Sequence, residues 1–310
     1  MADLPKRVLG RTGVEVTTLG YGAMELRGGA RGGREVSDAD AGRMLNAVLD
    51  SGITFIDTSI DYGVSEELIG EHLSGRRDEY FLASKCGCFV VGDPTQSAGG
   101  RSPHIFTREN VVAGVEQSLR RLQTDHLDLV QLHASPSKQV LEENGTIEVL
   151  KELQEQGKVR FLGISGTIPN LADHIAMGVF DVFQIPYSCV QREHENLIAQ
   201  AAEAGAGIII RGGAAKGAPS ESQRARERNP ELLSTWDKAG LDDLLEGATP
   251  MEFVLRFTAT HPAMTTNIVG TVSPDHLAGN VAAVAMGPLP DDVYDEAKRR
   301  LDEAGSAPEA

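Results

Sequence analysis

The sequence predicts an α/β fold, a (β/α)8 TIM barrel with an N-terminal β-hairpin, because short apolar segments and amphipathic helical patterns take turns along almost the whole chain. The expected strands are 18–24, 53–59, 80–86, 127–133, 159–165, 182–188, 207–213 and 265–271. They are nearly continuous in Val, Ile, Leu and Phe, as strands buried on both faces should be. Eight such units close into a barrel, and residues 1–310 are therefore expected to form a single domain.

The segment ahead of the first barrel strand predicts a short hairpin. Residues 8–16 have two apolar ends around a turn that contains Gly10 and Gly13. We expect this hairpin to close the bottom of the barrel.

Helical patterns fill the intervals between the predicted strands, and their apolar residues recur at the spacing of one helix face, as Val111 and Val115 do. Gly52, Gly157 and Gly205 stand where left-handed C-caps would end three of these helices. The predicted helices are 38–51, 65–74, 107–122, 145–156, 170–177, 195–204, 249–259 and 274–284, and 291–304 also has a helical pattern.

Two long connections lie where the carboxyl ends of the strands should be. Residues 87–105 are rich in Gly, Pro and Ser, and residues 212–248 combine Gly and charged residues with a short helix. Long βα loops usually act as lids or pocket walls. We expect Met24, Phe89 and Trp236 to wall a substrate pocket, but no residue specifies a sugar, a steroid or a small aldehyde.

The composition of the chain argues against several classes of binding partner. The chain has 29 Lys+Arg against 45 Asp+Glu, a net charge of −16, which repels nucleic acid and anionic lipid. It has neither a signal-peptide core nor the ~18 apolar residues of a membrane span. Cys86, Cys88 and Cys189 are too sparse for a disulfide framework and are expected to be ordinary thiols and not metal ligands. We expect a cytoplasmic protein with no nucleic-acid, membrane or metal partner.

Four ionisable side chains fall at the ends of three successive predicted strands or in the loop that follows: Asp57, Tyr62, Lys85 and His133. A carbonyl that accepts a hydride develops alkoxide character and needs a proton donor, which Tyr62 would be. A phenol has a pKa near ~10, and we expect the Lys85 ammonium to lower it, with Asp57 balancing the lysine charge. His133 would hydrogen-bond the substrate oxygen.

Each of these residues also has an ordinary structural explanation: a capped strand, a surface Tyr, a paired Lys and a satisfied His. Their joint occurrence in this order favours the catalytic interpretation. Asp61 is a rival carboxylate beside Tyr62, and we expect it to face solvent or to cap the helix at 65–74.

Together, Asp57, Tyr62, Lys85 and His133 resemble the Asp, Tyr, Lys and His tetrad of the aldo-keto reductase superfamily, and the likeness runs from Gly10 to Asn280. The resemblance implies an NADPH-dependent oxidoreductase that reduces an aldehyde or ketone to an alcohol, with Tyr62 as general acid. It also allows an alternative, a nicotinamide-binding, redox-sensing regulatory subunit of the same fold. A barrel isomerase or lyase is a weaker third interpretation. The expected partner is a small carbonyl substrate, and the chain is expected to be a monomer or a weak homo-oligomer.

No Gly-x-Gly-x-x-Gly motif follows an opening strand, so the barrel itself would have to hold the dinucleotide. Gly163-Ile164-Ser165-Gly166 and Gln184-Ile185-Pro186-Tyr187-Ser188 resemble the segments that bind the carboxamide and stack a Tyr on the nicotinamide. Gly166 stands where the family commonly has Asn. Residues 211–217 resemble the loop that crosses the pyrophosphate, and residues 269–280 resemble the phosphate- and adenine-binding turn. The implied cofactor-binding residues are Ser165, Gln184, Tyr187, Arg211, Gly213, Lys216, Gly270, Thr271, Ser273, His276 and Asn280.

The expected cofactor is NADPH, with NADH as the alternative. A helix N-terminus favours an anion, which suits the 2′-phosphate of NADPH. Relatives often carry Arg where this chain has His276, and Asp275 stands beside it. We therefore expect a modest preference for NADPH.

Overall fold

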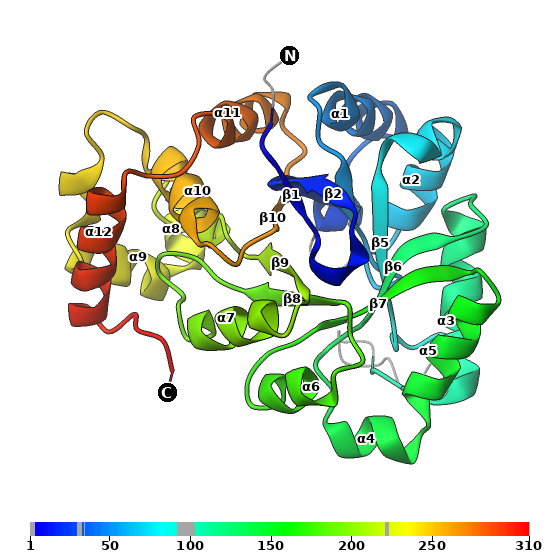
Figure 1. Cartoon of the computed structure of the whole chain (residues 1–310). Helices are drawn as coiled ribbons and strands as arrows, with labels where there is room; N and C mark the ends of the chain where they lie inside the picture. The colour runs from blue at the N-terminus through cyan, green and yellow to red at the C-terminus, as the bar shows by residue number, and fades with distance from the viewer. Residues whose placement is uncertain (1–3, 30–32, 34, 92–102, 221–222, 310) are drawn as a thin grey trace.

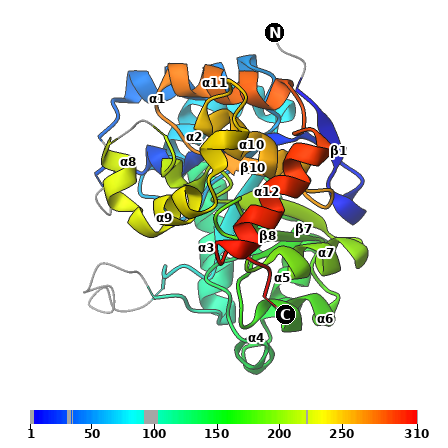
Figure 2. The same ribbon diagram turned by 90° about the vertical axis from the view of Figure 1, so that its left-hand side faces the viewer.

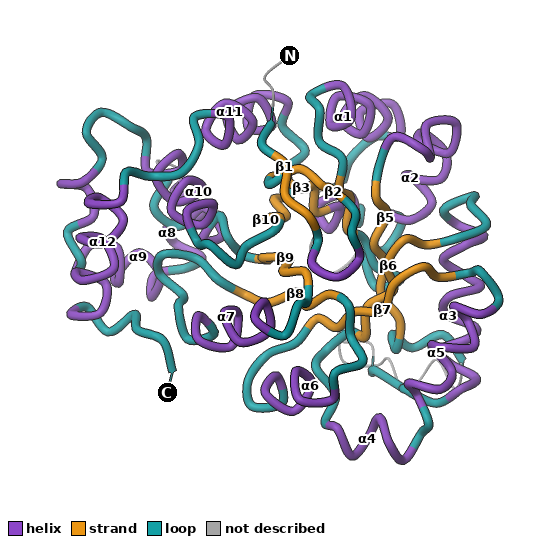
Figure 3. Tube along the Cα trace, in the orientation of Figure 1, coloured by secondary structure: helices purple, strands orange, loops and turns teal. Residues whose placement is uncertain are grey.

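The computed structural model describes residues 4–29, 33, 35–91, 103–220 and 223–309. Eight parallel strands close into a barrel in the order β10-β3-β4-β5-β6-β7-β8-β9, with helices around it (Figures 1 and 3). The predicted (β/α)8 fold is confirmed, and every predicted strand contains an observed one. The barrel strands are β3 (Leu19–Gly22), β4 (Phe55–Asp57), β5 (Phe81–Cys86), β6 (Leu127–Leu132), β7 (Val159–Ser165), β8 (Val182–Pro186), β9 (Gly207–Arg211) and β10 (Thr266–Val269).

The helices predicted between the strands are also present. They are α1 (Asp38–Asp50), α2 (Ser65–Leu73), α3 (Arg108–Arg121), α5 (Thr146–Glu155), α6 (Leu171–Met177), α7 (Glu195–Glu203), α10 (Pro250–Thr260), α11 (Pro274–Ala285) and, after the barrel, α12 (Asp291–Glu303). Gly52, Gly157 and Gly205 follow α1, α5 and α7 with φ of 92°, 75° and 84°, the left-handed conformation expected of them. Within the described ranges, every helix is too short or too polar to span a bilayer.

Three helices depart from the prediction. Helix α4 (Lys138–Glu143) was not expected at all, and the loop expected to hold one short helix holds two, α8 (Gln223–Arg228) and α9 (Pro230–Lys238). Of the other long loop, residues 92–102 lie outside the described part of the chain. Short helices of about two turns carry weak periodicity, because six to nine residues sample one face only two or three times.

Successive strand residues alternate between the barrel interior and the layer of helices. Phe55 and Phe81 belong to an inner apolar cluster with Leu129, Val182 and Ile209. The residues next to them, such as Ile56, Leu82 and Val130, belong to the larger outer core that packs against the helices. This two-residue period decides which side chain at each strand end can reach the mouth of the barrel.

The N-terminal hairpin closes one end of the barrel, as predicted. Strands β1 (Lys6–Val8) and β2 (Glu15–Thr17) pair antiparallel, and Leu9 and Val16 join the inner cluster, both fully buried. The hairpin crosses the barrel in Figure 1, and Figure 2 places it at the end opposite α8 and α9. Gly10 has φ +51°, and a Cβ there would overlap the backbone of Ala206 and Gly207 at the start of β9.

The close contact at Gly10 predicts an unequal effect of two alanine substitutions in one turn. Gly13 also has positive φ, at +69°, but a Cβ there meets no atom within 4 Å. Gly13→Ala should lower the free energy of unfolding by about 1–2 kcal/mol through backbone strain. Gly10→Ala should cost about 1–3 kcal/mol more, because β9 must also move. Urea denaturation followed by circular dichroism measures both, and equal effects would contradict the plug geometry.

Candidate active site

A buried ion pair lies at the carboxyl end of the barrel. Lys85 ends the inward face of β5, and its Nζ donates to Asp57 Oδ2 at 2.6 Å and to the Thr58 carbonyl at 2.8 Å. The two side chains are 1% and 2% exposed. Burial alone would lower the pKa of Lys85, but the Asp57 carboxylate and Tyr62 outweigh it and raise the net pKa. Lys85 therefore stays protonated, as expected.

The second oxygen of Asp57 is held by two amides. Gln131 Nε2 and Gln184 Nε2 donate to Asp57 Oδ1 at 2.9 and 2.8 Å, and Ser165 Oγ donates to Gln184 Oε1 at 3.3 Å. The carboxylate thus accepts one charged and two neutral hydrogen bonds, which is what a buried anion requires. Five strand ends, those of β4 to β8, meet in this network.

Tyr62 sits above the ion pair in the loop after β4. Its amide donates to the Ser59 carbonyl at 3.0 Å, and the Lys85 ammonium lies 4.9 Å from its ring centroid. Lys85 does lower the pKa of this phenol, as expected, but it does not set the net direction of the shift. Burial raises the pKa of Tyr62 more than Lys85 lowers it, and Asp57 adds to the rise, so the net pKa is above the usual value. The phenol therefore carries its proton at neutral pH.

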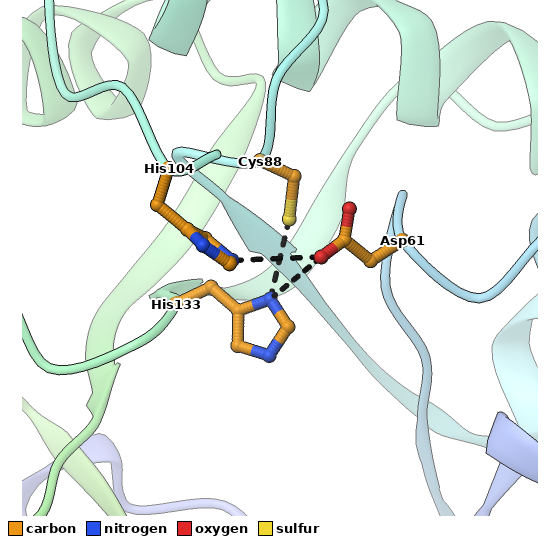
Figure 4. A group of neighbouring side chains, drawn as sticks. All are labelled: Asp61, Cys88, His104 and His133. Atoms are coloured by element: carbon orange, nitrogen blue, oxygen red, sulfur yellow. Dashed lines mark hydrogen bonds and ion pairs between the residues drawn. The ribbon is translucent and has the colours of Figure 1, made fainter. Parts of the chain in front are cut away.

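His133 follows β6 and presents its ring edge-on to Tyr62, with ring centroids 6.3 Å apart. Its Nδ1 lies 3.2 Å from Cys88 Sγ and 3.7 Å from Asp61 Oδ2 (Figure 4). Burial lowers the pKa of His133 to about 3, and Lys85 and His104 contribute to the shift. His133 is therefore neutral at physiological pH.

Asp61 does not face solvent or cap the helix at 65–74, contrary to expectation. Its side chain is 5% exposed and lies between His104 and His133, with Oδ2 3.5 Å from His104 Nε2. Helix α2 begins after Val64 without a side-chain cap. The turn that carries Tyr62 brings Asp61 inward, which local sequence alone does not reveal.

A cleft of about 1670 Å³ opens above these residues. Lys85 lies just beneath its floor and does not line it, while Met24 does, as expected of a pocket wall. The other predicted residues that line the cleft are Asp57, Tyr62, His133, Ser165, Gln184, Arg211, Lys216, Gly270, Thr271, His276 and Asn280. The structure therefore brings together both groups that the sequence suggested, the tetrad and most of the cofactor-binding set.

Tyr187 does not line the cleft, so its predicted stacking on a nicotinamide ring is corrected. Its ring packs on Phe257 and His261, with centroids 6.2 and 5.1 Å away, and its hydroxyl is 3.4 Å from that of Tyr294. Tyr187 is three positions after Gln184, and an odd spacing along an extended segment reverses the direction of the side chain. Gln184 faces the barrel mouth, so Tyr187 faces the helices.

Four more expected contributors, Phe89, Gly213, Ser273 and Trp236, do not line the cleft. Gly213 packs its backbone against Asn267, and its carbonyl accepts from Thr258 Oγ1 at 3.0 Å. Ser273 caps α11, accepting from the His276 amide. Trp236 is buried, and its Nε1 donates to Asp242 at 3.0 Å.

Several residues of the site were missed in the sequence. Gln131 stands two residues before His133, so strand alternation alone could have placed it inside the barrel. Glu25, Ser135, Thr167, Thr249, Met251 and Glu252 also line the cleft. No local signal marks these six, because closure of the barrel brings them to the cleft from separate loops and helix ends.

Arg211 brings a positive charge into the cleft. It ends β9 on the inward face, and its Nε is buried without a hydrogen-bond partner among the described residues. Burial lowers the pKa of Arg211, against the opposing influence of Tyr62 and Asp57. A buried donor with spare capacity is one that a bound ligand would satisfy.

Comparison with known proteins gives a consistent result. The aldo-keto reductase YhdN of Bacillus subtilis is 34% identical over 195 residues, 60% of this chain and just over half (55%) of that protein. L-galactose dehydrogenase of Arabidopsis thaliana is 29% identical over 300 residues, which cover 92% of this chain and 89% of the plant protein. The holo form of aldo-keto reductase AKR11C1 from Bacillus halodurans has a TM-score of 0.83 at 27% identity, with 96% of both chains covered. Since the model of the Aldo/keto reductase family matches residues 18–302, from the first barrel strand into α12, this chain belongs to that family of carbonyl oxidoreductases.

Proposed function

We propose that this protein reduces an aldehyde or ketone to an alcohol with NADPH, and that Tyr62 is the general acid. One observation carries the proposal: a protonated phenol lines a large cleft directly above a buried ammonium that a carboxylate holds in place. A structural tyrosine would not require a fully buried lysine beneath it, because burying that charge is unfavourable.

Four residues of the site have different roles in the proposed reduction. A carbonyl oxygen placed between Tyr62 and His133, whose rings lie edge to face, would accept hydrogen bonds from the Tyr62 hydroxyl and from a ring N–H of His133. As negative charge develops on that oxygen, the phenol proton moves to it, and the Lys85 ammonium stabilises the phenolate left behind. Asp57 keeps Lys85 charged and oriented throughout. The reverse oxidation uses the same groups, with the phenolate as base.

The cleft fits a dinucleotide. NADPH, when bound, supplies the hydride. The ends of β7 and β8 offer Ser165 and Gln184 to a carboxamide, and Arg211 offers its Nε, which has no hydrogen-bond partner among the described residues, to an anionic or carbonyl group. At the far end, Asp275 and His276 of the first turn of α11 line the cleft, and a helix N-terminus favours a phosphate. A Cβ at Gly270 would lie 2.6 Å from the Gly22 carbonyl oxygen, so the close packing of this wall of the cleft against the end of β3 requires glycine.

The proton-donor role predicts the effect of removing one hydroxyl. Tyr62→Phe should lower kcat for carbonyl reduction by about 10²–10⁴-fold, because general-acid catalysis contributes that much. Cofactor affinity should stay within a few-fold of the wild type. Tyr187→Phe is the matched control, since it deletes a hydroxyl outside the cleft and should retain turnover. Steady-state kinetics at 340 nm and cofactor fluorescence titration provide both readouts.

A Tyr62→Phe enzyme with turnover within about tenfold of the wild type would refute the proton-donor assignment. Loss of cofactor binding in the same variant would show that the phenol holds the dinucleotide instead.

Cofactor choice is the next prediction. His276 and Asp275 both line the cleft at the start of α11, where the helix N-terminus favours a phosphate and the Asp275 carboxylate opposes it, so NADPH should bind only modestly tighter than NADH. His276→Arg should tighten NADPH and leave NADH nearly unchanged, because only NADPH carries the 2′-phosphate. Asp275→Asn should shift the preference in the same direction. Fluorescence titration with both cofactors tests this, and equal or tighter NADH binding by the wild type would reject the preference for NADPH.

A further inference from the structure

Four side chains with metal-ligating atoms converge behind the cleft. They are Asp61 in the loop after β4, Cys88 and His104 at the two ends of the loop after β5, and His133 after β6. One atom from each, a carboxylate oxygen, the thiol sulfur and two ring nitrogens, lies within 4.8 Å of the other three (Figure 4). Of these residues, only His133 has a part in the proposed reduction.

The spacing of the four atoms suits one small ion. Zinc bonds of about 2.0–2.3 Å in a tetrahedron put neighbouring ligand atoms about 3.3–3.8 Å apart. The distances here are 3.2 Å from Cys88 Sγ to His133 Nδ1, 3.5 Å from Asp61 to His104 Nε2 and 3.7 Å from Asp61 to His133 Nδ1. The other three pairs lie within 4.8 Å, so shifts of at most about 1 Å would complete the shell.

The donor types also favour zinc. Sulfur and imidazole nitrogen select borderline and soft metals, and a carboxylate is a common fourth ligand, whereas magnesium and calcium take oxygen. A thiolate and a carboxylate carry two negative charges, which would neutralise Zn²⁺ in a partly buried site. Binding would release the Cys88 thiol proton to solvent.

The backbone holds these residues in place without an ion. Cys88 and His104 form an isolated antiparallel bridge, and the amides of Phe89 and Ile105 donate to carbonyls across the loop at 3.1 and 2.7 Å. The buried Asn110 at the start of α3 donates to the carbonyls of Cys88 and Ile105 at 2.9 and 2.8 Å. Both ends of the loop are therefore tied to one helix.

One ring nitrogen of His104 is available to bind a metal ion. Its Nε2 is buried and has no hydrogen-bond partner in the described residues, although it points at the centre of the group (Figure 4). Its ring meets that of His133 edge to face, with centroids 4.8 Å apart. A metal ion would satisfy this nitrogen and hold both rings in their observed orientation.

We propose that Asp61, Cys88, His104 and His133 form a zinc site. Four protein ligands complete a tetrahedron, so the ion is structural and has no open position for substrate. Coordination through Nδ1 leaves the proton of His133 on Nε2, the nitrogen on the other side of the ring (Figure 4). Zinc would thereby fix His133 as a hydrogen-bond donor and anchor the loop after β5 to the active site.

A second acidic and histidine group provides a control. Asp38, Glu71 and His72 also lie within range of one another, but they have no sulfur ligand and their carboxylates are exposed. His72 Nε2 already pairs with Asp38 Oδ1 at 2.8 Å. Exposed groups of this kind are common without a metal, so this group carries no proposal.

Titration of the full-length protein with ZnCl2, after chelator treatment and dialysis, tests the site. A chromophoric chelator competes for the ion, and one Zn²⁺ per chain is expected. His104→Ala should weaken binding by about 100-fold or more, since even residues that only support a zinc ligand change affinity by 10–100-fold. His72→Ala should keep wild-type affinity and stoichiometry.

Binding of Co²⁺ in place of Zn²⁺ tests whether the Cys88 sulfur is a metal ligand. Bound Co²⁺ should show a thiolate charge-transfer band that Cys88→Ala loses and Cys189→Ala, a buried cysteine elsewhere, retains. Thermal melts should show Zn²⁺ stabilising the wild type and His72→Ala but not His104→Ala. Absence of stoichiometric binding, or binding unchanged in His104→Ala, would overturn the proposal, and neither result requires Cys88→Ala to fold. These readouts are independent of reductase activity, so failure of the zinc site leaves the proposed reduction untouched.

Discussion

The ion pair between Lys85 and Asp57 is the constraint on which the rest of the site depends. A lysine with a 1% exposed side chain is stable only if a carboxylate and further acceptors replace the water it has lost. Here the Thr58 carbonyl, Gln131 and Gln184 complete that replacement around the pair. These partners come from several strands, so the hydrogen bonds around this one ion pair help to fix how those strands align. The Tyr62 ring lies against the Lys85 ammonium and depends on the same alignment.

Strand alternation explains how so many polar groups reach one place. Phe55 fills the barrel interior, so Asp57, two residues on, also points inward, and the same step leads from Ala83 to Lys85 and from Ile209 to Arg211. The apolar layer below and the polar layer above are therefore successive layers of inward-facing side chains, two residues apart along the same strands. The hairpin seals the apolar layer from the other end, which leaves the mouth as the accessible face.

The same alternation separates what the sequence could predict from what it could not. Strand and helix positions, Asp57, Lys85 and Ser165 follow from local pattern and strand ends. The family resemblance predicts Tyr187 at the nicotinamide, but its odd spacing from Gln184 turns its side chain toward the helices. The grouping of Asp61 with His104 depends on how two loops fold toward each other, and no periodicity encodes that. The raised pKa of Tyr62 likewise depends on burial, which only the packed structure reveals.

The hairpin at the bottom of the barrel has a consequence for synthesis of the chain. Leu9 and Gly10 are synthesised well before Gly207 and Ile209, the residues of β9 that they pack against. The apolar residues of the hairpin therefore remain exposed to solvent until β9 has been synthesised and can pack against them. Contacts between such distant segments slow folding and expose a growing chain to aggregation. The nascent protein is thus most vulnerable while its barrel is still open, in the interval between synthesis of the hairpin and synthesis of β9.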